Sequence, residues 1–300
     1  MNAPNLRFKE FTDEWENKKI KDFILSHKGG APLRPADFVK NGGYEVIPKK
    51  AISSGGKLAL DLNNATFCSE SFFKNNSRSV VDESYLITTL RDLVPSGPSI
   101  GYIVKFTSNK SYLLAQGVYG IKIDNNLDES FLIHYSNTDK YRVMMQTMMV
   151  GSTQVHIRNS DFFKTPVNIP SLPEQTKIAN FLTAIDEKIS QLTQKYDLLK
   201  QYKKGVMQQI FSQKLRFKDE DGREFPGWKE KRLGDIGENI IGLTYLPSNV
   251  TTDDAYPIVL RSSNIKDDVL VLEDLVRVKE KISEKLFVKE NDILICTRVC

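Results

Sequence analysis

Residues that build metal sites and disulfide frameworks are scarce in this sequence, which has three cysteines and three histidines among 300 residues. The cysteines, Cys68, Cys296 and Cys300, lack paired CxxC spacing, which predicts reduced thiols and argues against a disulfide framework or a structural zinc site. No run approaches the roughly 18 to 20 apolar residues that span a bilayer, and the N-terminus is too polar for a secretory signal. We therefore expect a cytoplasmic protein with no membrane partner.

Motifs of catalysis are lacking as well. The sequence has no G-x-x-x-x-G-K-[ST] loop for a nucleotide, no Asn-Pro-Pro-Tyr-type run for adenine methylation and no H-E-x-x-H metal motif. The three histidines, His27, His134 and His156, are dispersed along the chain, so we expect a structural or surface role for each. These absences favour a non-catalytic protein that binds no metal.

The composition is that of a globular chain, with 40% apolar and 10% aromatic residues and enough length for two packed domains. The formal net charge is only +4, but it is distributed unevenly: seven Lys or Arg and a single acid lie between Lys195 and Lys218. Such a cluster suits phosphate oxygens, but it is more typical of the solvated face of a long helix. The charge pattern alone leaves both interpretations open.

A long helix is the clearest pattern in the sequence. Between Glu174 and Phe211 apolar residues alternate at spacings of four and three, a 3.5-residue repeat over about five heptads. Because this a/d stripe is narrower than the apolar face of an ordinary amphipathic helix, it predicts coiled-coil pairing with another helix. The a and d residues, interrupted only by Lys203, are Ile178, Leu182, Ile185, Ile189, Leu192, Tyr196, Leu199, Val206 and Ile210.

The start of this helix is also marked. Pro170 and Pro173 exclude an earlier start, and Ser171 and Glu174 have the S-x-x-E spacing of a capping box, so the helix is expected to begin near Leu172. At the α-helical rise the predicted segment makes a rod of about 57 Å. This length predicts a spacer as well as a packing surface.

The sequence contains an internal repeat, visible as four pairs of segments that match in the same order. The pairs are LRFK at 6–9 and 215–218, WENKKIKDF at 15–23 and WKEKRLGDI at 228–236, YEVIPK at 44–49 and YPIVLR at 256–261, and LITTLR at 86–91 and ILICTR at 293–298. Four collinear matches at nearly constant offset predict two copies of one structural unit.

The fold class expected from these patterns is α+β. Short apolar or β-branched runs separated by Gly, Pro and Asn predict strands, and a more helical segment follows them. The expected strands are 44–47, 85–90, 100–106 and 118–123, and the helical segment is 130–149. We divide the chain into a globular domain at 1–170, the long helix at 171–213, a linker at 214–227 and a partial second copy of the domain at 228–300.

The second copy has only its early half in this sequence. It stops at Cys300, just after the apolar run 293–296 that we expect to form a core strand. A half-copy should be poorly stable alone. We therefore expect either a fragment of a longer protein or a naturally shortened one.

This order of segments resembles the DNA-specificity subunit of type I restriction-modification enzymes. The resemblance rests on a globular domain, the run NIPSLPEQTKIA at 168–179, the heptad helix and a second copy that opens with WKEKRLGDI; GSTQ at 151–154 is also similar to the family pattern. It implies that each globular domain is a target-recognition domain that reads one half of a split DNA site, with helices as the spacer between the halves. Members of the family complete two such domains and two helices, so the resemblance implies truncation within the second domain.

The resemblance also implies the partners. These are DNA, the methyltransferase (M) subunits and the restriction (R) subunit, with self-association through the long helix as a further expectation. No cofactor is expected on this chain, whereas S-adenosylmethionine, ATP and Mg²⁺ are expected on the partner subunits, which would carry the nuclease and adenine methyltransferase activities.

Phosphate contacts are expected from Lys, Arg and hydroxyl groups, and base contacts from Arg, Gln or Asn in projecting loops. In the first domain the candidate DNA-binding residues are Lys49, Lys50, Lys57, Arg78, Arg91, Ser152, Thr153 and Gln154.

Two other functions fit the same patterns. A coiled-coil adaptor without DNA specificity would bind its partner through an apolar helix, an interface that salt leaves intact, whereas DNA affinity falls steeply with salt. Alternatively, a shortened subunit with one complete domain and one helix would form a homodimer through that helix and read a palindromic split site. A monomeric mass by light scattering would contradict the homodimer.

Overall fold

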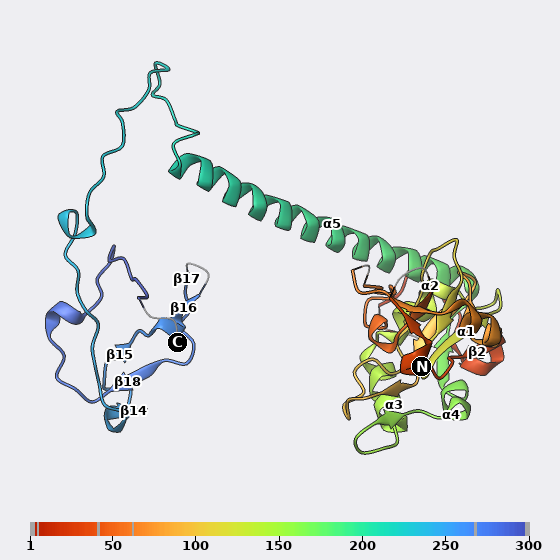
Figure 1. The fold of residues 1–300 in the computed structure, drawn as a ribbon. Coiled ribbons are helices and arrows are strands. Elements are labelled where there is room, and N and C mark those ends of the chain that lie inside the picture. Colours follow the sequence, from red (N-terminus) through yellow and green to blue (C-terminus); the bar gives the residue numbers. More distant parts are fainter. Residues whose placement is uncertain (1–3, 5, 41–42, 62, 267–268, 298–300) are drawn as a thin grey trace. The chain divides into compact units, whose positions relative to one another are not determined.

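The computed structural model describes residues 4, 6–40, 43–61, 63–266 and 269–297 (Figure 1). The chain divides into two compact units, Met1–Gln209 and Ile210–Cys300. Two positions used in the sequence analysis, Arg298 at the end of the repeat and Cys300, lie outside the described residues. In the part of the chain that the structure describes, no helix has the length and apolar character needed to cross a membrane.

The first unit combines short helices and short strands with one long helix. Its helices are α1 (Glu70–Asn75), α2 (Glu129–Ser136), α3 (Asp139–Met148), α4 (Asn159–Phe163) and α5 (Leu172–Phe211). Its strands are β1 (Glu16–Lys19), β2 (Ile24–Gly29), β3 (Phe38–Val39), β4 (Tyr44–Ile47), β5 (Thr66–Cys68), β6 (Val80–Val81), β7 (Leu86–Thr89), β8 (Arg91–Asp92), β9 (Ile103–Val104), β10 (Tyr112–Leu114), β11 (Val118–Ile123), β12 (Val155–His156) and β13 (Pro166–Ile169).

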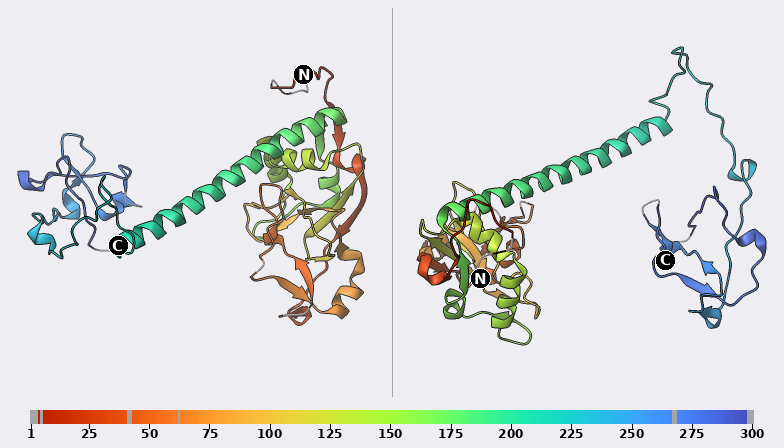
Figure 2. Two further views of the ribbon diagram at one scale, coloured as in Figure 1. Left: turned by 90° about the horizontal axis from the view of Figure 1, so that it is seen from above. Right: turned by 180° about the vertical axis from the view of Figure 1, so that it is seen from behind.

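The long helix begins at Leu172, as its capping and proline pattern predicts, and runs without interruption through the whole heptad region. Figures 1 and 2 show it leaving the globular part of the first unit as one continuous rod. Only its first turns are covered, since Glu174, Gln175 and Ala179 are its buried residues. Most of the rest of the helix is exposed to solvent, apart from half-buried residues such as Val206 and Ile210 near its end.

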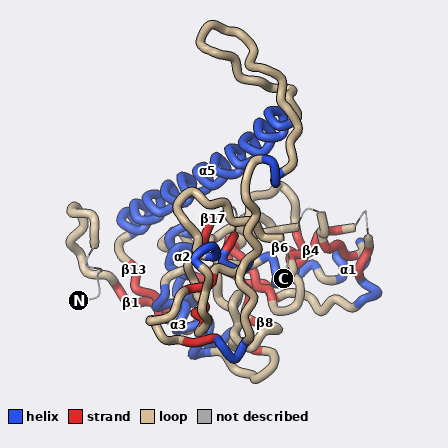
Figure 3. The backbone as a smooth tube through the Cα atoms, turned by 90° about the vertical axis from the view of Figure 1, so that its left-hand side faces the viewer, coloured by secondary structure: helices blue, strands red, loops and turns tan. Residues whose placement is uncertain are grey.

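Two larger sheets make up the globular part of the first unit. One has the strand order β3-β5-β4-β10-β6 and the other β2-β11-β7-β9, while β1 pairs with β13 and β8 with β12. Within the first sheet β4 and β10 run parallel, whereas β10 and β6 run antiparallel. Figure 3 shows the short strands joined by long loops. Since β10 leads directly into β11, the turn between them links the two sheets.

The strands predicted at 44–47 and 118–123 are confirmed, with the same bounds, as β4 and β11. The run 85–90 contains β7, and the predicted helical segment 130–149 forms α2 and α3. The strand predicted at 100–106 was too long, because only Ile103–Val104 is a strand. Gly101 has a φ of +79° and Ile100 closes a turn onto Gly97, so the start of this run bends instead of extending.

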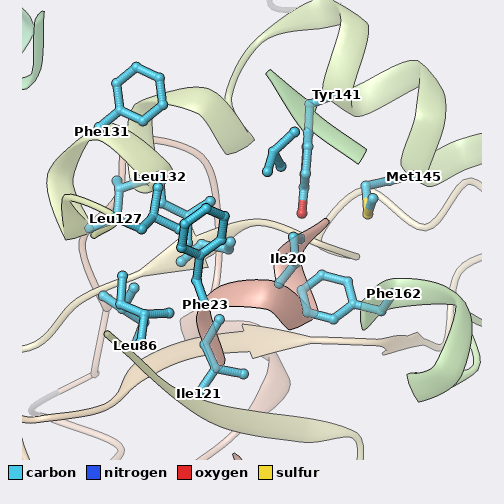
Figure 4. Close-up of a cluster of buried hydrophobic side chains, with 14 of the residues drawn as sticks. Ile20, Phe23, Leu86, Ile121, Leu127, Phe131, Leu132, Tyr141, Met145 and Phe162 are labelled. Carbon is cyan, nitrogen blue, oxygen red and sulfur yellow. The ribbon is translucent and has the colours of Figure 1, made fainter. Parts of the chain in front are cut away.

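The main core of the first unit lies where α2, α3 and α4 meet β7, β11 and the N-terminal segment (Figure 4). Ile20, Leu86 and Phe162 are fully buried there, and each such side chain contributes about 1.5–3 kcal/mol by leaving water. The polar end of Tyr141 is satisfied as well, since its hydroxyl donates to the carbonyl of Gly101 at 3.0 Å. Ala179 of α5 belongs to the same cluster, so the helix base is part of the core.

The second unit consists of short strands and long loops. Its strands are β14 (Val250–Thr251), β15 (Ile258–Val259), β16 (Ile265–Lys266), β17 (Val269–Leu270) and β18 (Val276–Val278). They form a sheet of order β14-β18-β15 and a β16-β17 pair.

The apolar run 293–296 was expected to form a core strand in this unit, and this expectation was wrong. The described residues of the run are not in a strand, and Ile293 and Ile295 are 87% and 62% exposed. Its counterpart in the first unit, β7, is buried because β11 and β9 pair with it on both sides. Within the described residues of the second unit, no strand pairs with the run.

Candidate nucleic-acid interface

The turn between β10 and β11 is held rigidly by both sheets. The amide of Val118 donates to the carbonyl of Ala115 at 2.9 Å, and Gly117 has a φ of +89°, a conformation that favours glycine. The amide of Ala115 donates to Ile47 at the end of β4, and the carbonyl of Gly117 accepts from Leu90 at 3.1 Å. The position of the turn is therefore determined from both sides.

Lys49 and Arg91 lie side by side over this turn. A Cβ placed on Gly117 would be 3.0 Å from the Cβ of Arg91 and 3.4 Å from the Cδ of Lys49. Below them the buried hydroxyl of Thr89 lies 3.0 Å from the carbonyl oxygens of both Arg91 and Gly117, and it can donate to either. The tertiary structure thus brings two of the predicted DNA-binding cations together over Gly117, and both side chains are half-exposed.

The predicted loop residues are brought to the same edge by strand pairing. His156 in β12 pairs with Arg91 in β8, and His156 exchanges two backbone hydrogen bonds with Val150, at 2.9 and 3.0 Å. The loop between these residues reverses direction at Gly151, whose φ is +115°. It presents three exposed side chains, those of Ser152, Thr153 and Gln154.

The remaining predicted cations are all exposed but are less closely grouped. Lys50 follows Lys49 in the 3-10 turn Lys49–Ala51. Arg78 precedes β6, and the antiparallel register of β6 with β10 puts it at the same end of the sheet as the β10–β11 turn. Lys57 is exposed and lies in a segment that forms a parallel bridge with Lys105.

An ionised carboxylate orders the loop that follows Arg91. Burial alone would raise the pKa of Asp92, but hydrogen bonds from Ser99 and from backbone amides such as that of Val94 outweigh burial and hold the pKa below its ordinary value. The hydroxyl of Ser99 donates to this carboxylate at 2.6 Å and the amide of Val94 at 3.1 Å. The negative charge of Asp92 is thus stabilised by hydrogen bonds from residues of its own loop.

No group of three or more His, Cys, Asp and Glu side chains is placed to hold a metal ion among the described residues. The buried thiol of Cys68 lies in β5, and burial raises its pKa.

The base of α5 is fastened by residues that the sequence analysis assigned differently or missed. Glu174 was expected to cap the helix backbone, but its two oxygens each accept a hydrogen bond from the guanidinium of Arg7 at 2.6 Å. The indole of Trp15 also donates to this carboxylate at 3.4 Å, and the ring of Phe8 packs edge-on against Phe181. The signal for these contacts lies in the repeated LRFK and Trp segments, which contain Arg7, Phe8 and Trp15.

The predicted helix interface separates into three parts, of which the last, Val206 and Ile210, is half-buried. Ile178 packs against the core of the first unit and Leu182 is half-buried, so these residues contact their own domain. The next five a and d residues are 41–63% exposed: Ile185, Ile189, Leu192, Tyr196 and Leu199. We call these five residues the exposed seam.

Comparison with known families places these features in context. Residues 12–201, more than half of the chain, match the model of the type I restriction modification DNA specificity domain. The chain belongs to this family. The match covers the globular part of the first unit and continues through the NIPSLPEQTKIA run into α5, which confirms the resemblance inferred from that junction.

Two relatives are specificity subunits of Methanocaldococcus jannaschii type I restriction enzymes. The MjaVIII subunit is 21% identical over 70% of this chain and 48% of its own length, and the MjaIX subunit is 23% identical over 74% and 51%. A solved S subunit from M. genitalium is 17% identical, with a TM-score of 0.44, over 68% of this chain and 48% of that chain. The chain spans about half the length of the relatives that it matches.

Proposed function

We propose that this chain is a DNA-recognition subunit of a type I restriction-modification enzyme and that its first unit reads one half of a split DNA site. The observation that carries the proposal is the grouping of Lys49 and Arg91 over the β10–β11 turn, beside the exposed loop 152–154. Cations at such a place bind phosphates and fix the register of the protein on the duplex, while neutral polar side chains beside them read base edges. The family match supports this function and does not favour an adaptor without DNA specificity.

The geometry of α5 fits a spacer. A helix of 40 residues spans about 60 Å, and only its first turns are buried in the domain. The Arg7–Glu174 pair and Trp15 fasten the base of the helix to the globular part of the first unit. The separation between two half-sites then follows from the helix, as it does in other DNA readers with fixed spacing.

The exposed seam is the proposed attachment surface for a second helix. Apolar a and d residues that stay in water destabilise a protein unless a partner covers them, so this seam supports either self-association or pairing with a helix of a second specificity domain. We place the M subunits and the R subunit as the further partners, with S-adenosylmethionine, ATP and Mg²⁺ bound by those subunits and catalysis carried out there.

The test is selection of DNA from a random duplex pool by the full chain assembled with its cognate M subunit. Enrichment of a split sequence is the expected result, and a double variant, Lys49→Ala with Arg91→Ala, should recover little DNA. Lys21→Ala is the matched control, because Lys21 is an exposed lysine in the 3-10 turn Ile20–Phe23. A complex that forms but enriches no sequence would overturn the proposal.

A further inference from the structure

Gln116 is the exposed residue of an otherwise covered stretch of chain. Tyr112, Leu113 and Leu114 before it are buried, as are Gly117 and Val118 after it, and Ala115 is half-buried. The hydrogen bond between Ala115 and Val118 makes these four residues a β-turn with Gln116 at its second position and glycine at its third. The tip of this turn therefore presents one side chain, an amide, to solvent.

The backbone around Gln116 has little freedom to move. On one side the amides of Gly30 and Ala31 donate to the carbonyls of Val118 and Leu114, each at 2.9 Å. The approach is so close that a Cβ on Gly30 would lie 1.8 Å from the carbonyl oxygen of Ala115. Together with the hydrogen bond that Ala115 donates to Ile47 and the one that Gly117 accepts from Leu90, these contacts hold the turn from several directions. A side chain carried on so rigid a support is positioned more accurately than one on a free loop.

The surroundings of Gln116 are electropositive. Gly117, the next residue, is covered by the side chains of Lys49 and Arg91, two of the predicted phosphate-binding cations. A phosphate backbone held by these cations brings base edges toward the neutral tip next to them. Glutamine offers a carbonyl acceptor and an NH₂ donor in one plane, and adenine presents the complementary N6 donor and N7 acceptor in the major groove.

We propose that Gln116 is a specificity-determining residue that reads an adenine in the half-site of the first unit by a paired hydrogen bond to N6 and N7. This inference rests on the proposed DNA-recognition function and names the side chain and the base that carry part of it. Lys49 and Arg91 set the position of the duplex, and Gln116 distinguishes one base pair.

The experiment repeats the selection from a random duplex pool with the full chain and its cognate M subunit, using the unaltered chain, Gln116→Ala and Gln116→Glu. A bidentate contact of this kind discriminates by roughly 5- to 150-fold against the wrong base. Gln116→Ala should lose that preference at one A·T pair and keep it at every other position. Gln116→Glu should shift the same position toward cytosine, because a carboxylate accepts from the N4 amino group of cytosine.

Two controls separate the outcomes. Gln194→Ala removes an exposed glutamine on α5, outside the exposed seam, and should select the same sequence as the unaltered chain. Because Gln116 is exposed and uncharged, its alanine variant should also keep the melting temperature and the salt dependence of DNA binding. If the unaltered chain enriches a sequence and Gln116→Ala enriches the same one with equal preference at every position, this inference is wrong and the proposed function stands. If the unaltered chain enriches nothing, the proposed function and this inference both fall.

Discussion

The salt dependence of DNA binding offers the sharpest test of the Lys49–Arg91 grouping. The perturbation is the removal of each charge alone, in Lys49→Ala and Arg91→Ala, and of both together. Neither substitution should unfold the domain, since both side chains are half-exposed and, at position 91, alanine retains the Cβ that contacts Gly117. A change in DNA binding therefore reports on the charges and not on the fold.

The magnitude follows from counterion release. Each phosphate that a cation neutralises contributes about 0.9 to the slope of log affinity against log salt. Between 50 and 200 mM salt one such contact accounts for a loss of about 3.5-fold in affinity, and two contacts for about 12-fold. Each single variant should therefore lower the slope by about 0.9, and the double variant by about 1.8 if the two cations bind different phosphates.

The assay is fluorescence anisotropy with a labelled duplex of unrelated sequence, titrated with the full chain at four salt concentrations. Lys21→Ala removes an exposed lysine from another part of the first unit and measures the effect of lost net charge alone. Slopes for the Lys49 and Arg91 variants that equal the slope of the Lys21 variant would refute the reasoning, because these cations would then neutralise no phosphate.

Three further predictions concern stability and assembly. Gly117→Ala puts a side chain at a φ of +89° and against Arg91, and should lower the free energy of unfolding by about 1–3 kcal/mol in urea titration. Tyr141→Phe leaves the carbonyl of Gly101 without its donor, at a cost of about 1–3 kcal/mol. Burial raises the pKa of Tyr141, so the folded protein stabilises the neutral phenol. The free energy of unfolding should therefore fall as the pH rises above about 10, the ordinary tyrosine pKa. In Tyr141→Phe the same rise in pH should lower the free energy of unfolding by less. Leu192→Asp in the exposed seam should reduce the mass found by light scattering to that of one chain with unchanged circular dichroism, and equal masses for both proteins would contradict self-association through α5.

Secondary structure was predicted well where a local pattern decides it. The strands β4 and β11 have their expected bounds because their β-branched and apolar residues follow a glycine, and β4 ends before Pro48. The run at 100–106 was misjudged because its apolar residues are buried in a turn as well as in a strand, and residue type alone does not distinguish the two. The apolar run at 293–296 shows the same limit, since burial depends on neighbouring strands.

The candidate site shows the limit of sequence reasoning more clearly. The candidate DNA-binding residues were selected by residue type, and nothing in the sequence ranked one above another. They include Lys49, Arg91, Gln154, Lys57 and Arg78. Gln116 was not selected at all, because a single glutamine in an apolar stretch has no distinguishing pattern. The glycine that follows Gln116 indicates a tight turn, but it does not indicate that the glutamine side chain is exposed at the tip of that turn.

The sequence by itself determined the family, the internal repeat and the long helix with its start at Leu172. These are local or periodic properties: a 3.5-residue spacing, two prolines and a matching order of segments need no knowledge of the remaining chain. Only the tertiary structure decided that Glu174 pairs with Arg7, that Ile178 belongs to the core and that Lys49 meets Arg91 over Gly117. Such contacts join residues far apart in the chain, and they depend on the strand register and on the turn that links the two sheets.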